Sequence, residues 1–268
     1  AMQHAIDPKV DCVFKAILGS VEHVNLSLDF LNAMLEAELP SPLVSVELLN
    51  PYNEKEFLSD KLSIVDVKAK DQNDCLYQIE IQLLTYPSLT ARMLYAWCDL
   101  YSQQLHSGQD YYQLKPTYAI WLVDDTVFPR DAFYRRYFAM RDECQQPLLA
   151  HGGILVVELQ KFRAAVIATQ QQRWLQFFKQ GEEFTDRSQL PDWMQDTAME
   201  QAMSILERFS EKERAYHQYQ ARQNYLREQA TIQHDLAQMQ QTLLAERAEK
   251  EALLAQLQAL RAQLAGKT

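Results

Sequence analysis

Two carboxylates in this sequence, Asp66 and Glu80, have the type and spacing that could bind a metal ion. Each lies in a short segment, residues 64–68 and 78–82, whose polar and apolar side chains alternate as in a β-strand. The alternation turns three further polar side chains toward the faces that carry the carboxylates: Lys68, Gln78 and Gln82. Two carboxylates on neighbouring strands make a candidate site for a divalent cation.

The opposite faces of both segments are apolar, which indicates that this side packs on a core. They carry Val65, Val67, Ala69, Tyr77, Ile79, Ile81 and Leu83. The connecting residues 71–74, Asp-Gln-Asn-Asp, have the composition of a turn, so we expect an antiparallel hairpin. Such alternation is also typical of a sheet with one face in water, where the polar side chains are simply solvated.

The composition narrows the classes of function. The chain has 268 residues, 47% of them hydrophobic, which is enough for a sizeable core and an appendage. Its cysteines and histidines lack the spacing of zinc ligands. No glycine-rich phosphate loop is present, so we expect no nucleotide cofactor. The net charge of −10 argues against a protein that coats nucleic acid, but it is compatible with a nuclease whose acidic residues hold cations.

The sequence predicts neither membrane insertion nor secretion. No apolar run reaches the roughly 20 residues that a membrane helix needs. The amino terminus lacks a basic region followed by an apolar stretch and a cleavage site. The scattered cysteines are typical of reduced thiols. We therefore expect a cytoplasmic protein with no membrane partner.

Helices and strands are expected to follow one another along the first 180 residues. Apolar spacing predicts helices at about 10–18, 24–38, 89–106 and 161–179. Strands are predicted in the hairpin and at 43–49, 115–123, 133–140 and 154–159. This order of helix, three-strand meander, helix and strand predicts an α/β fold with a mixed sheet. We expect this domain to span residues 1–180, followed by a connector and helix at 181–209.

A long helix is predicted after Asp192, because no Pro or Gly occurs from there to Gly266. Within residues 210–268 a heptad pattern places Leu236, Leu243, Lys250, Leu257 and Leu264 at position a, and Ile232, Met239, Glu246, Leu253 and Leu260 at position d. The pattern predicts a left-handed coiled coil that joins copies of the chain into a homo-oligomer. The alternative is a lone amphipathic helix packed on its own domain. The charges of Glu246 and Lys250 inside the seam cost stability and could set strand number or alignment.

The motifs around the hairpin resemble those of a known family. A carboxylate on one strand, Glu-x-Lys or Glu-x-Gln on its partner, and a helix behind resemble the PD-(D/E)XK nuclease superfamily. More narrowly, the chain resembles the recombination-promoting nuclease and transposase family of bacteria. The matching segments lie in order between Asp7 and Asp124: Asp7 to Lys15, Phe30 to Ala33, Ile64 to Ala69, Ile79 to Gln82, Arg92 with Tyr95, and Gln104 to Tyr111.

This resemblance implies a restriction-endonuclease-like core and a divalent-metal-dependent DNA endonuclease linked to recombination or mobile elements. It implies that Asp66 and Glu80 are catalytic metal ligands, with a backbone carbonyl such as that of Ile81 as a further oxygen and Mg²⁺ or Mn²⁺ as the ion. Such an ion lowers the pKa of a bound water and shields charge on the phosphoryl oxygens, so that the phosphodiester can be hydrolysed.

Gln82 departs from the superfamily pattern, which usually has Lys at this position. A neutral amide can orient water or bond a phosphate oxygen, but it cannot supply a cation. Lys68 could supply that charge, because it shares a strand face with Asp66. The alternative is a surface lysine beside an acidic patch. The resembled family itself tends to carry Gln here, so we still count Gln82 and Lys68 among the candidate catalytic residues.

Three other residues are weaker candidates. Arg92 could contact a phosphate, although a structural ion pair is the more frequent outcome for such a residue. Asp11 could add an accessory metal contact, although a helix cap or a solvated face is more common. Tyr95, one helical turn from Arg92, is most simply a core residue.

Three functions are compatible with these observations. The first is a DNA endonuclease in which dimerisation through the terminal helix brings two sites together for two-strand cutting. The second is a non-catalytic interaction protein on a degenerate nuclease scaffold, which Gln82 and the acidic charge favour. The third is a transposase that performs strand transfer, since that reaction uses the same metals and differs only in its nucleophile.

Overall fold

The computed structural model describes residues 2–52 and 66–265, so Ile64 and Val65 of the predicted hairpin lie outside the described residues. The chain forms two units, Ala1–Arg222 and Gln223–Thr268, which are described separately here. None of the described helices is both long and apolar enough to cross a membrane.

The first unit is built on a six-stranded mixed sheet, in the spatial order β1-β2-β3-β4-β6-β5. Its strands are β1 (Val46–Leu48), β2 (Asp66–Asp71), β3 (Leu76–Gln82), β4 (Thr117–Val123), β5 (Arg135–Phe138) and β6 (Gly152–Glu158). The first three strands pair antiparallel as a meander, β4 joins parallel to β3 and to β6, and β5 pairs antiparallel with β6. The predicted α/β fold with a mixed sheet and a restriction-endonuclease-like core is confirmed.

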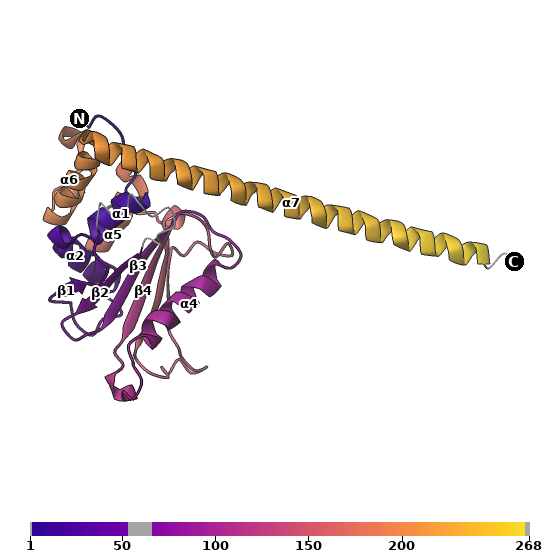
Figure 1. Cartoon of the computed structure of the whole chain (residues 1–268), viewed down its shortest axis with the longest axis horizontal. Coiled ribbons are helices and arrows are strands. Elements are labelled where there is room, and N and C mark those ends of the chain that lie inside the picture. Colours follow the sequence, from indigo (N-terminus) through magenta and orange to yellow (C-terminus); the bar gives the residue numbers. More distant parts are fainter. Residues whose placement is uncertain (1, 53–65, 266–268) are drawn as a thin grey trace. The chain divides into compact units, whose positions relative to one another are not determined.

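Helices cover both faces of this sheet (Figure 1). They are α1 (Asp11–Leu18), α2 (Val24–Met34), α4 (Leu89–Ser102) and α5 (Gln170–Gln180). Helix α6 (Thr197–Glu211) packs on α1, α2 and α5, and α7 (Glu213–Ala265) follows it. On one face, Leu89 and Met93 of α4 pack against Trp121 of β4 and Val156 of β6. On the other, α1, α2 and α5 form a layer whose aromatic rings interlock, with Phe30 edge-on to Trp174 at 5.5 Å between ring centroids.

Two predicted helices differ from the structure. The helix expected at 161–179 begins only at Gln170, because Thr169 and Gln172 form a capping box: the Thr169 side chain accepts a hydrogen bond from the Gln172 amide, and the Gln172 side chain accepts one from the Thr169 amide. The long helix expected after Asp192 is interrupted at Lys212, whose backbone is extended, and this separates α6 from α7. The other predicted elements occur with ends shifted by a few residues.

Residues of α6 and the start of α7 belong to the first unit. One face of α6 is buried, with Met199, Met203 and Leu206 inaccessible to solvent. At the start of α7, the hydroxyl of Tyr219 accepts a hydrogen bond from the backbone amide of Asp7 at 3.0 Å. Arg222 forms a two-point ion pair with Asp11, whose Nε–Oδ1 distance is 3.0 Å. These contacts extend the compact unit to Arg222.

The second unit is the remaining helical part of α7. Its heptad side chains are about half exposed, from 48% for Leu243 to 67% for Met239. The other large apolar side chains of the stripe, Ile232, Leu236, Leu253, Leu257 and Leu260, fall between these two values. An apolar stripe of this length on a helix surface is available for packing against another helix.

Candidate functional site

Asp66 and Glu80 lie directly opposite each other in the β2–β3 hairpin, where they are register partners. The predicted antiparallel hairpin is therefore confirmed, and its turn has the expected chemistry. The Asp71 carboxylate accepts hydrogen bonds from the amides of Asn73 and Cys75, and Asp74 adopts a positive φ of 62°. Because register partners project from the same face, the two site carboxylates meet above the sheet.

The polar face of this hairpin is buried. Asp66 is 8% exposed, Glu80 4% and Gln78 4%. The interpretation in which these side chains are simply solvated is therefore wrong. The apolar face behaves as predicted, since Val67 and Ile79 are fully buried on the opposite side. Burying two neighbouring carboxylates is costly unless cations or hydrogen-bond donors compensate them, so their partners decide what the site can do.

Gln78 donates to both carboxylates. Its Nε2 lies 3.1 Å from Asp66 Oδ2 and 3.0 Å from Glu80 Oε1, so one amide group bridges the pair. Its own Oε1 is buried and has no hydrogen-bond partner among the described residues. The site thus contains a third buried oxygen whose lone pairs are unused.

Asn50 fixes the orientation of Asp66 from the end of the first strand. Its Nδ2 donates to Asp66 Oδ1 at 3.0 Å and to the Asp66 carbonyl at 3.2 Å, while its Oδ1 accepts from the Lys68 amide at 2.7 Å. Asn50 directly follows the strand predicted at 43–49, and no sequence pattern singles it out as a site residue. The signal that the sequence does carry is an Asn directly before a Pro at the end of a strand. Pro51 has no backbone N–H to donate, whereas the Asn50 side chain can hydrogen-bond to the adjacent strand.

Each carboxylate has a cationic neighbour. Lys68 Nζ lies 3.5 Å from Asp66 Oδ2, with 32% of its side chain exposed. Arg92 reaches down from α4 and places Nη2 3.2 Å from Glu80 Oε2. The guanidinium also lies over the ring of Trp121, 5.3 Å from its centroid, which restricts its position. Two carboxylates and two cations therefore balance one another at the site.

Gln82 lies beside the guanidinium of Arg92. Its Oε1 accepts from Arg92 Nη1 at 3.4 Å, and its Nε2 donates to the Leu84 carbonyl at 2.8 Å. The same Nη1 donates to the Tyr86 hydroxyl at 3.0 Å. A positive charge is therefore present next to the position where the superfamily usually has Lys, and it comes from helix α4. Tyr86 is a further residue of the site that no sequence motif indicates.

The environment of Glu80 raises its pKa to about 7, chiefly because burial disfavours the charged carboxylate. Arg92 opposes this shift by stabilising the anion, whereas the nearby Asp66 carboxylate reinforces it. A carboxyl group whose proton is bound and released near neutral pH is typical of functional sites, although structural ion-pair networks also perturb pKa values.

Other residues singled out in the sequence lie elsewhere. Asp11 pairs with Arg222 and accepts a hydrogen bond from the Cys12 amide, so the structure does not bring it together with Asp66 and Glu80. Tyr95 is 74% exposed, which makes the expectation of a core residue wrong. Gln104 is structural, because its amide donates to the Lys115 carbonyl at 3.0 Å and accepts from the Lys115 amide at 2.8 Å.

The donors at the hairpin fit a hard divalent cation. The two carboxylates are oxygen donors, and the backbone carbonyl of Ile81, the residue after Glu80 in β3, is the predicted third donor. Gln78 turns its Nε2 toward both carboxylates, so its unbonded Oε1 would add a donor only after the amide turns over. Across the described residues no cluster of three or more His, Cys, Asp or Glu side chains could hold a metal. A two-carboxylate site suits Mg²⁺, which retains several of its waters.

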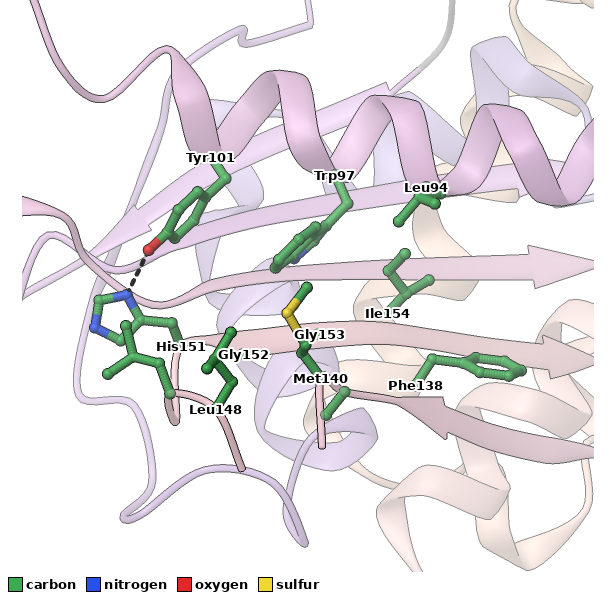
Figure 2. A pocket seen from close by; sticks show the side chains of 12 residues that line it. Leu94, Trp97, Tyr101, Phe138, Met140, Leu148, His151, Gly152, Gly153 and Ile154 are labelled. Carbon is green, nitrogen blue, oxygen red and sulfur yellow. Dashed lines mark hydrogen bonds between the residues drawn. The ribbon is translucent and has the colours of Figure 1, made fainter. Parts of the chain in front are cut away.

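A concave surface lies beside the carboxyl-terminal half of α4. It is a cavity of about 480 Å³ that includes Leu94, Trp97, Met140 and Ile154 in its lining. Figure 2 shows its one polar end, where the Tyr101 hydroxyl and His151 Nδ1 lie 2.9 Å apart. Burial and the charge of Lys115 lower the pKa of His151, which favours its neutral form. With no carboxylate in its lining, this cavity lacks the donors that a cation would need.

Comparison with known proteins identifies a family that the chain matches. A family model described as PD-(D/E)XK nuclease family transposase matches residues 8–235, which include the hairpin, α4 and the start of α7. No curated protein and no solved structure matches the chain.

Proposed function

This chain belongs to the PD-(D/E)XK nuclease family transposases, and from that membership we propose that it is a divalent-metal-dependent DNA endonuclease whose ligands are Asp66, Glu80 and the backbone carbonyl of Ile81. The observation that carries the proposal is the pairing of two buried carboxylates across the β2–β3 ladder. Two carboxylates buried side by side are costly even with Lys68 and Arg92 beside them, and paired carboxylate oxygens are the donors that Mg²⁺ prefers, which supports a cation at this point.

Each neighbouring residue has a role in this proposal. Asn50 holds the Asp66 carboxylate in one orientation, and Gln78 spaces the two carboxylates. Lys68 and Arg92 compensate the carboxylates when no ion is bound. When Mg²⁺ or Mn²⁺ is bound, the ion supplies Lewis-acid stabilisation of the phosphoryl oxygens and lowers the pKa of a water. Lys68 and Arg92 also carry the donors and positive charge that phosphate oxygens would bind.

Gln82 takes a positioning role. Its amide accepts from Arg92 and donates to the Leu84 carbonyl, which holds the guanidinium beside Glu80. Arg92 therefore supplies the cation that the superfamily usually takes from Lys at the position of Gln82. This arrangement supports an active site despite the neutral amide at that position.

DNA is the substrate that membership of a nuclease family implies. The acidic chain, with a net charge of −10, attracts DNA weakly by itself. Bound divalent ions reverse the local field at the carboxylates. We therefore expect DNA to bind far more tightly when the metal is present.

Each part of the chain has its own role in the proposal. Residues 1–180 carry the chemistry, residues 181–209 form a connector and helix, and residues 210–268 join copies of the chain as a coiled coil. The half-exposed heptad side chains of the second unit support this role for the last segment. Because Tyr219 and Arg222 bond to Asp7 and Asp11, the first turns of α7 also stabilise the catalytic unit.

Cleavage of supercoiled plasmid in Mg²⁺ or Mn²⁺ tests the catalytic proposal. Glu80→Gln and Asp66→Asn keep the size of each side chain but remove its charge, and we expect each to lower the cleavage rate by roughly 100-fold or more. Glu38→Gln is the matched control, because Glu38 is a half-buried carboxylate paired with Arg135 at 2.5 Å. Equal cleavage by the wild type and Glu80→Gln would indicate a contaminating nuclease and refute the proposal.

A second candidate is a non-catalytic interaction protein on a degenerate nuclease scaffold. The balance of two carboxylates by two cations favours it, since such a network can persist as a structural element without a metal. Calorimetric titration with Mn²⁺ separates the two. Binding that is lost in Asp66→Asn supports the nuclease, whereas absence of binding in the wild type supports the scaffold.

Strand transfer, the reaction of a transposase, is the third candidate, and the word transposase in the family description favours it. It requires the same metal site with a DNA hydroxyl in place of water as the nucleophile. Labelled oligonucleotides in the cleavage assay distinguish the reactions, because strand transfer yields joined products longer than the substrate strands and hydrolysis yields only shorter ones.

A further inference from the structure

The apolar stripe of the second unit carries two charges at its centre. Glu246 occupies position d and Lys250 the next position a, with apolar heptad residues on both sides of them. Neither charge has an ion-pair partner in the part of the chain that the structure describes, although their spacing of four residues would allow a pair within the helix. Two unpaired charges in an otherwise apolar stripe need partners from outside when the stripe is covered.

From this pattern we infer that α7 pairs with α7 of a second copy in antiparallel orientation, with the two-fold axis at Ala248. The inference rests on the proposed self-association of residues 210–268 and specifies its geometry. The occupant of the stripe is a second copy of this chain because the stripe is complementary to itself when one copy is reversed, as an isologous interface requires.

Reversal about Ala248 brings Glu246 opposite Lys250 of the partner subunit, and the symmetry repeats that pair. The same operation places every described position a opposite a position d. The resulting apolar layers pair Leu243 with the partner subunit's Leu253, Met239 with the partner subunit's Leu257, and Leu236 with the partner subunit's Leu260. The interface between the two helices therefore has apolar layers at both ends and two ion-pair layers in the middle.

Other arrangements leave the charges unmatched. In a parallel, in-register pair each residue faces its own copy, so Glu246 meets Glu246 of the partner subunit and Lys250 meets Lys250 of the partner subunit. An antiparallel pair shifted by one heptad places both charges opposite leucine or methionine. Polar residues in a seam commonly determine alignment at some cost in stability, and only the register centred on Ala248 pairs these charges.

The inferred geometry bears on how the dimer works. Gln223 is the first residue of the second unit and directly follows the globular unit. In an antiparallel pair the two copies of Gln223 lie at opposite ends of the paired segment. A dimer that brings two sites together at one end would instead need parallel helices. The inferred pairing therefore separates the two copies of Gln223 by the length of the paired segment.

Spin-label distances in the full-length chain test the orientation. Single cysteines at His234, Ala248 and Ala262 occupy the outer position f of every second heptad, in a background where the exposed Cys98 and Cys144 are replaced by Ser. At 1.5 Å per residue, the antiparallel pair predicts label separations above about 40 Å for positions 234 and 262. It predicts about 20 Å for position 248. About 20 Å at all three positions would show a parallel pair and refute the orientation while leaving self-association intact.

A charge-reversal cycle tests the ion-pair layers independently. Glu246→Lys converts both central layers into Lys–Lys layers in the antiparallel pair, so we expect the dimer dissociation constant to rise about tenfold or more. The double variant Glu246→Lys with Lys250→Glu restores opposite charges and should return the constant to within about threefold of the wild type. Glu251→Lys makes the same change in net charge outside the stripe and is the control, with less than about threefold effect expected. Equal dissociation constants for Glu246→Lys and the wild type would overturn the inference. A wild type that is monomeric at protein concentrations of tens of micromolar would overturn both the inference and the proposed self-association.

Discussion

Arg92 of α4 lies 3.2 Å from Glu80 of β3, so the cation nearest the buried acidic pair is supplied by a helix that packs across the sheet. In most members of the superfamily that charge comes from a Lys two residues after the Glu, where this chain has Gln82. Gln82 instead accepts a hydrogen bond from the same guanidinium. A positive charge is thus present at this point of the site, and Arg92 supplies it instead of a Lys at position 82.

Removal of the Arg92 charge is expected to shift the pH dependence of cleavage. The guanidinium stabilises the Glu80 anion and so lowers its pKa from the value that burial alone would give. In Arg92→Gln the pKa of Glu80 rises further, and we expect the ascending limb of the pH–rate profile to move by about one unit toward alkaline pH. Arg92→Lys keeps the charge and should keep the profile close to that of the wild type. An unshifted profile in Arg92→Gln would contradict the assignment.

The stability of the protein is expected to fall as the pH rises through the range in which Glu80 ionises. Its pKa is about 7 in the folded protein, against 4.5 as the ordinary value, so the folded state binds a proton more tightly than the unfolded state. This contribution is fully present below about pH 4.5 and lost as the pH passes 7, with an amplitude of up to about 3 kcal/mol. Glu80→Gln cannot ionise, so urea unfolding at pH 5 and pH 8 should show a smaller loss for the variant than for the wild type.

Divalent metal is expected to stabilise the fold, and more strongly at high pH. A ligand that binds only the folded state at 100 times its dissociation constant adds about 2.7 kcal/mol. Because the ion binds the ionised form of Glu80, Mn²⁺ should raise the melting temperature more at pH 8 than at pH 6. The increase should vanish in Asp66→Asn and persist in Glu38→Gln. An increase of equal size in Asp66→Asn would place the ion elsewhere in the protein.

Asn50→Ala should weaken the site as well as the fold. It removes the bonds to the Asp66 carboxylate and to the Lys68 amide, which we expect to cost about 1–3 kcal/mol of stability and to lower Mn²⁺ affinity roughly tenfold. Asn32→Ala is the matched control, since Asn32 bonds both the amide and the carbonyl of Leu43 in the same way. Equal Mn²⁺ affinities in the two variants would show that Asn50 is only structural.

Asp11→Asn should destabilise the protein without affecting metal binding. Asp11 pairs with Arg222, and removal of the Asp11 charge weakens this largely buried ion pair, at a cost of roughly 1–3 kcal/mol. Denaturant unfolding measures this cost, and titration with Mn²⁺ measures affinity. A clear loss of Mn²⁺ affinity at unchanged stability would instead make Asp11 an accessory ligand.

The elements that local patterns describe could be predicted from the sequence. Alternation identified the hairpin and placed Asp66 and Glu80 on one face, because side chains along a strand alternate between faces. The capping box that starts α5 at Gln170 is also visible in the sequence, as Thr169 and Gln172. The apolar spacing before Thr169 is helical as well, and it predicted an earlier start for this helix. The heptads of α7 are local as well, and the predicted long helix is present from Glu213 onward.

Only the tertiary structure decided what surrounds the carboxylates. Alternation could not distinguish a solvated face from a buried one, since that depends on whether α4 packs over it. Nor could sequence spacing bring Arg92 to Glu80, direct Asn50 onto Asp66, or pair Asp11 with Arg222. These contacts join residues on different elements, and side-chain partners across elements depend on packing rather than on local periodicity. The sequence by itself therefore determined which residues could bind a metal, and packing decided which charges and amides compensate them.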